Sequence, residues 1–119
     1  MNMIAKKVTG VDASDALDIH LAADAVLRTA QTSVEARLTT MAWLDALIDA
    51  LPLRTLMAMA VAYAQRPPGA PIDAVVYTAL TLSYCRRFRC DWTHAGAAIL
   101  QAATVPGIMP EDDLIGASA

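Results

Sequence analysis

The sequence LMAMAVAYAQ, from Leu56 to Gln65, and the sequence AVVYTALTLSYC, from Ala74 to Cys85, contain no charged residue. A helix at a protein surface has one apolar side and one polar side, whereas a helix that is apolar all round is buried. A chain of 119 residues has little material with which to bury two such helices. The two stretches therefore predict a helical core, and they indicate self-association or a protein partner.

The composition agrees with a partly covered surface. Hydrophobic residues make up 56% of the chain and charged residues 18%, against usual values of about 45–50% and about 25%. The net charge of −3 is mild, whereas a nucleic-acid-binding protein usually has a strong basic excess. We therefore expect no nucleic-acid partner, and an anionic membrane is disfavoured for the same reason.

The sequence favours a cytoplasmic protein. No uncharged apolar stretch reaches the ~18 residues of a membrane span, and the N-terminal residues lack the pattern of a secretory signal. The two cysteines, Cys85 and Cys90, do not form a disulfide framework.

Proline and glycine divide the chain into helices. Pro52 follows an amphipathic segment, and proline is tolerated only at the start of a helix, which predicts a corner at Leu51–Pro52. The segment Arg66–Pro71 (RPPGAP) is the strongest loop signal. The predicted helices are 13–30, 33–50, 52–65, 72–88 and 92–104.

Helix-capping residues support these boundaries. Thr32 and Glu35 have the spacing of a capping box, Ser33 is a second candidate for the same helix start, and Asp91 can cap the last helix. Pro71 is well placed to open the fourth helix.

The predicted fold is all-α: a compact bundle of about five helices with 52–65 and 72–88 as a central antiparallel hairpin. No segment alternates apolar and polar residues as a strand does. We expect a single domain over 1–105. The irregular tail, 106–119, is acidic at 111–113 and is predicted to be flexible or extended.

Aromatic and methionine side chains are the predicted interface residues, because aromatic residues concentrate binding energy and methionine adapts to irregular surfaces. They lie in the two uncharged stretches and beside them: Met57, Met59, Tyr63, Tyr77, Tyr84, Phe88 and Trp43.

One alternative function is a metal site or a thiol nucleophile near Cys85, Cys90 and His94, with Asp91 as a further ligand. The chain has no C-x-x-C pair and no signature of a thiol enzyme, so this cluster is weak. A small core cysteine and an aspartate cap account for the same residues. We therefore assign no metal, cofactor or catalytic residue.

A second alternative is phosphate or nucleic-acid binding by Arg86, Arg87 and Arg89. Cations near a helix C-terminus more often meet its free carbonyl groups, or pair with acids such as Asp45 and Asp49. The sequence thus favours a small helical protein–protein interaction or adaptor module that self-associates, with a dimer as the preferred state and without catalytic activity. The metal-binding or thiol-dependent enzyme and the nucleic-acid-associated regulator remain alternatives.

Overall fold

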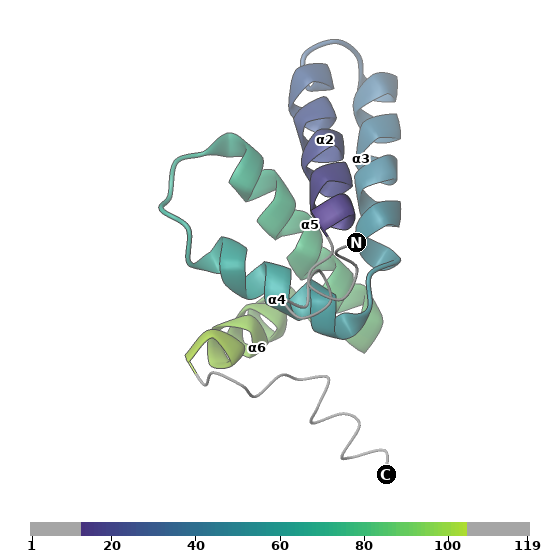
Figure 1. Ribbon diagram of the computed structural model, residues 1–119. Coiled ribbons are helices and arrows are strands. Elements are labelled where there is room, and N and C mark those ends of the chain that lie inside the picture. Colours follow the sequence, from purple (N-terminus) through teal and green to yellow (C-terminus); the bar gives the residue numbers. More distant parts are fainter. Residues whose placement is uncertain (1–12, 105–119) are drawn as a thin grey trace, which may run out of the picture.

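A computed structural model describes residues 13–104, and every regular element in this range is a helix (Figure 1). The predicted all-α bundle of five helices is confirmed, and each predicted helix end lies within one residue of the observed end. The acidic tail lies outside the described residues. The helices are α2 (Ala13–Thr29), α3 (Val34–Asp49), α4 (Leu53–Ala64), α5 (Pro71–Phe88) and α6 (Trp92–Thr104).

Helix α5 is the centre of the arrangement, because it packs against each of the other four described helices. Helices α2 and α3 lie side by side as an antiparallel hairpin on one side of it, and α4 and α6 pack together on the other (Figure 1). Helices α4 and α5 run in opposite directions and diverge toward the loop that joins them. Helix α5 thus lies between the α2–α3 pair and the α4–α6 pair.

The predicted corner at Pro52 separates α3 from α4, whose axes differ in direction by 117°. Leu51 is buried and its N–H donates to the Ile48 carbonyl at 3.0 Å. Pro52 is the N-cap of α4, and its carbonyl accepts the Leu56 N–H at 2.9 Å. Proline is tolerated here because residues at a helix start have no intrahelical acceptor for their N–H groups.

The observed caps settle the candidates that the sequence left open. The Ser33 hydroxyl accepts the Ala36 N–H at 3.0 Å and caps α3, whereas the Thr32 hydroxyl donates to the Thr29 carbonyl. Asp91 caps α6 as predicted, accepting the His94 N–H at 2.8 Å. Pro71 is the first residue of α5.

The core lies between the two pairs of helices and contains residues from all five helices. The α4 contribution is Leu56, Met57, Met59 and Ala60, and α5 contributes six buried residues, Val76, Ala79, Leu80, Thr81, Ser83 and Tyr84. The uncharged stretches therefore form much of the core, as their composition predicts. However, α5 is not covered all round, since Ala74, Thr78 and Leu82 are exposed. This uncovered side is where the candidate site lies.

Candidate functional site

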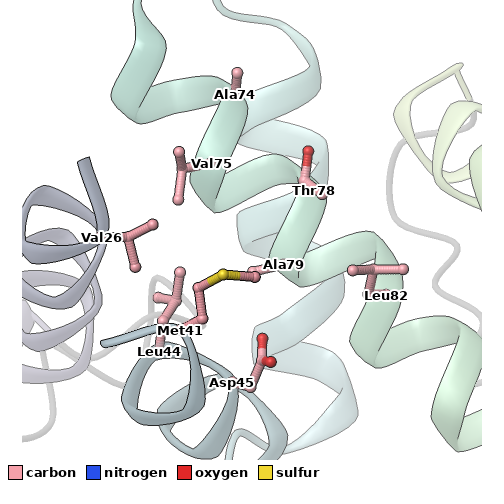
Figure 2. A pocket seen from close by; sticks show the side chains of 9 residues that line it. All are labelled: Val26, Met41, Leu44, Asp45, Ala74, Val75, Thr78, Ala79 and Leu82. Carbon is pink, nitrogen blue, oxygen red and sulfur yellow. The ribbon is translucent and has the colours of Figure 1, made fainter. Parts of the chain in front are cut away.

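An apolar groove lies where α2, α3 and α5 meet (Figure 2). Its volume is about 280 Å³. Among its nine lining residues only Asp45 is charged, and eight have no formal charge: Val26 of α2, Met41 and Leu44 of α3, and Ala74, Val75, Thr78, Ala79 and Leu82 of α5. The groove is therefore an apolar surface with a single carboxylate.

The α5 wall of the groove is an uncharged helical face. Ala74, Thr78 and Leu82 follow one another at four-residue spacing, which places them on one side of the helix. All three are exposed, and Leu82 keeps 40% of its surface accessible. Val75 is partly buried on the same side and packs against the core. This wall is a part of the apolar hairpin that the described helices leave uncovered.

The α3 wall continues as an apolar strip beyond the groove. Val34, Leu38 and Met41 lie at spacings of four and three residues, so they share one side of α3. Their exposed fractions are 65%, 57% and 41%. Single exposed apolar residues are common in soluble proteins, whereas a contiguous apolar patch marks an interaction site. Together the two walls form such a patch.

Asp45 supplies the charge of the groove and points from α3 toward α5 (Figure 2). Burial raises the pKa of this carboxyl group; the Arg86 guanidinium acts in the opposite direction, and the Asp49 carboxylate adds to the increase. The net effect is a pKa above its ordinary value. A cationic group that entered the groove would stabilise the charged form of this carboxyl group and lower its pKa.

Asp49, one turn further along α3, is paired with two side chains of α5. Its Oδ1 accepts hydrogen bonds from the Ser83 hydroxyl and from the Arg86 guanidinium, each at 2.7 Å. Burial raises the pKa of Asp49, but these two hydrogen bonds and the charges of Arg86 and Arg87 outweigh it, so the pKa is lowered. This pairing joins α3 to α5.

Arg87 completes the junction by capping α3. Its guanidinium donates to the Ile48 carbonyl at 2.8 Å and to the Asp49 carbonyl at 3.3 Å, and its Nε donates to Ser83. The Asp49 carbonyl is one of the last of α3 and has no intrahelical donor, so Arg87 gives it a partner, whereas the Ile48 carbonyl accepts Arg87 in addition to the Leu51 N–H. The expected pairing of the arginine cluster with a nearby acid is thus found for Arg86 and Asp49. Of the phosphate-binding candidates, Arg89 lies exposed at the C-cap of α5.

The seven predicted interface residues differ in how far the structure exposes them. Trp43 on α3 is 46% exposed. The other six are core or near-core side chains of the single chain: Met57, Met59 and Tyr84 are buried, and Tyr63, Tyr77 and Phe88 pack against the core. Their role in an interface therefore stays a prediction. Among the described residues, the large exposed apolar side chains are most numerous on α3.

Cys85, in the last turn of α5, and Cys90, in the turn after it, form the cysteine corner together with Asp91 and His94. Cys85 and Cys90 are partly buried free thiols, and the Cys90 N–H donates to the Cys85 carbonyl at 3.2 Å. Burial raises the pKa of Cys90, and Cys85 and Asp91 add to the increase. A raised pKa works against a thiolate nucleophile. Within residues 13–104, no three Cys, His, Asp or Glu side chains lie close enough together to hold a metal ion.

A second cavity of about 360 Å³ lies beneath the loop between α4 and α5, where Tyr63 and Tyr77 line it. Arg66 lies 4.4 Å from the centre of the Tyr63 ring and forms an ion pair with Asp73 at 3.0 Å. The charged groups of this cavity therefore pair with each other, and they hold the loop against both helices.

Comparison with models of protein families, with curated proteins and with solved structures gives no match to this chain. Within the described part of the chain, no single helix has the length and hydropathy to cross a membrane. Helices α3 and α4 satisfy that test only when taken together across their 117° bend.

Analysis of the sequence missed the groove, although part of its signal is present. Met41 and Leu44 lie in the amphipathic segment that precedes Pro52, and Val34 and Leu38 continue the apolar side of this segment toward its start at helical spacing. The spacing alone does not distinguish a core-facing strip from an exposed one. Only the direction in which α5 crosses the α2–α3 hairpin leaves this strip uncovered.

Proposed function

We propose that this protein is a small helical protein–protein interaction module that self-associates as a dimer and acts without a catalytic site. The observation that supports this function is the continuous apolar surface formed by the α3 strip and the α5 wall of the groove. Exposure of such a surface to water costs about 25 cal/mol of free energy per Å² of apolar area. Burial against another protein removes this cost.

The other two candidate functions have less support. Arg86 and Arg87 both form hydrogen bonds with α3, so two of the three arginines already have partners within the chain. The cysteine corner combines a raised Cys90 pKa with an aspartate that serves as a helix cap. We place the protein in the cytoplasm, where free thiols such as Cys85 and Cys90 stay reduced.

Light scattering after size exclusion, over a range of protein concentrations, tests the proposal. We expect twice the mass of the single chain at high concentration. Leu82→Glu places a charge on the α5 wall and should give the monomer. Leu100→Glu is the matched control, because Leu100 is 64% exposed on α6, away from the groove, and should leave the dimer intact.

A monomer at every concentration that also fails to bind a hydrophobic dye would contradict the proposed function. Dimerisation that is equally sensitive to both substitutions would show that the groove is not the surface involved. Circular dichroism of each variant checks that the fold is retained.

A further inference from the structure

The groove side of α3 carries a symmetric arrangement of charges around Met41. Arg37 lies four residues before Met41 and Asp45 lies four residues after it. A helix rises 1.5 Å per residue, so each charge lies about 6 Å from the level of Met41. The two charges are opposite in sign, and apolar Leu38 lies between them in the sequence.

This arrangement is complementary to itself. In a twofold-symmetric dimer, each residue of one copy meets a fixed residue of the other, and the reverse contact also occurs. If two α3 helices lie antiparallel with the axis at Met41, Arg37 of each copy meets Asp45 of the other. Met41 then meets its own counterpart, and the exposed side chain of Leu38 extends this apolar contact. A dimer with this single twofold axis thus contains two ion pairs between the copies, and it covers the apolar strip of each α3.

Both charged side chains are available for this contact. None of the ion pairs within residues 13–104 involves Arg37 or Asp45, since the nearby Arg86 forms its ion pair with Asp49. Arg37 is exposed and Asp45 is partly buried in the groove wall. A partly buried carboxylate is stabilised when a cation approaches it, and Arg37 of a second copy is such a cation.

We propose that the groove is covered by a second copy of this chain, whose α3 lies antiparallel to the first across a twofold axis at Met41, with Arg37 of each copy paired to Asp45 of the other. This arrangement rests on the proposed self-association and specifies its geometry. The charge pairing favours a second copy over an unrelated apolar helix, because one surface supplies both the cation and the anion at matching positions.

Charge reversal tests the pairing. Arg37→Asp and Asp45→Lys each place like charges opposite one another twice per dimer, so each should raise the dissociation constant by about tenfold or more. The double variant restores opposite charges and should return the constant to within about threefold of the wild-type value. Thr39→Lys is the control, because Thr39 is exposed and lies two residues from Met41, about 160° around α3 from it, and this substitution should leave the constant unchanged.

Cross-linking tests the position of the axis. A residue on a twofold axis faces its own counterpart, so Met41→Cys should form a disulfide-linked dimer under mild oxidation. Leu100→Cys provides an equally exposed thiol on α6 and should stay at the wild-type background, which Cys85 and Cys90 set.

The outcomes separate this inference from the proposed function. A wild-type dimer without rescue by the double variant and without cross-linking through Met41→Cys would overturn the α3 arrangement and leave self-association intact. A wild-type monomer at all concentrations would overturn both. Rescue together with selective cross-linking would establish the arrangement.

Discussion

Asp45 and Asp49 are identical side chains one helical turn apart, yet the fold gives them opposite pKa shifts. Burial in the groove wall dominates at Asp45 and raises its pKa. At Asp49, burial acts in the same direction, but hydrogen bonds from Arg86 and Ser83 outweigh it and lower the pKa. The difference arises from α5, which supplies two donors to Asp49 and an apolar wall to Asp45.

The two aspartates should therefore respond oppositely to neutralisation. Asp49→Asn should destabilise the fold at neutral pH by about 1 kcal/mol, because it weakens a solvent-screened ion pair and a hydrogen bond to buried Ser83. Since the pKa of Asp49 is lowered, its stabilisation is complete above the ordinary value of 3.8 and is lost as the pH falls through the folded-state pKa. The destabilisation by Asp49→Asn should shrink over the same pH range.

Asp45→Asn should instead stabilise the monomer slightly at neutral pH, by a few tenths of a kcal/mol, because it removes a partly desolvated charge. Since this pKa is raised, the cost of the charge is complete above the folded-state pKa and disappears as the pH falls to the ordinary value of 3.8. Urea unfolding of both variants across this range, at concentrations that favour the monomer, measures the two effects. Changes of the same sign would contradict the opposite shifts.

The uncharged stretch of α5, from Ala74 to Cys85, has one buried side and one exposed side. Leu80 is fully buried in the core, whereas Leu82, two residues later, is 40% exposed on the groove wall. Successive residues of a helix are rotated by about 100°, so two positions in sequence separate nearly opposite sides. The uncharged stretch of α5, from Ala74 to Cys85, thus has the core on one side and an open groove on the other.

Truncation of Leu80 and truncation of Leu82 should have different effects on the free energy of unfolding. Leu80→Ala should lower the free energy of unfolding by about 2–5 kcal/mol, because it leaves a cavity in the core. Leu82→Ala removes the same atoms from an exposed wall and should cost less than about 1 kcal/mol in the monomer. Chemical denaturation of both variants provides the measurement, and equal losses would mean that the groove wall is covered within the chain.

At the scale of the whole molecule, a small bundle leaves part of its apolar surface without internal cover. Helix α5 packs against four helices, but its divergence from α3 leaves the groove open. A second copy is the proposed cover, and its binding links stability to concentration because only the folded chain can dimerise.

The melting temperature of the wild-type chain should therefore rise with protein concentration. Above the dissociation constant, each tenfold increase adds a constant increment to the stability, about 1.4 kcal/mol per mole of dimer. Arg37→Asp should remove most of this dependence over the same range, and the double charge reversal should restore it. A concentration-independent melting temperature in the wild type, measured by circular dichroism, would contradict dimerisation.

Much of the fold was predictable because its signals are local. Pro52, Pro71, Ser33 and Asp91 act on backbone groups within a few residues, so the sequence indicates where helices begin and end. The candidate site was less predictable, because its parts come from three helices. Met57 and Met59 were predicted interface residues, yet the chain buries both, since apolar character alone does not tell a core from an interface.

The sequence by itself determined the helical class, the five described helices with their boundaries, and the uncharged stretches 56–65 and 74–85 within α4 and α5, because these follow from periodicity, capping and composition within short segments. Only the tertiary structure decided which sides of these helices are covered. The pairing of Asp49 with Arg86, the capping of α3 by Arg87 and the open groove between α3 and α5 all depend on how helices distant in sequence cross. Their crossing depends on the combined packing of many side chains, which no single segment specifies.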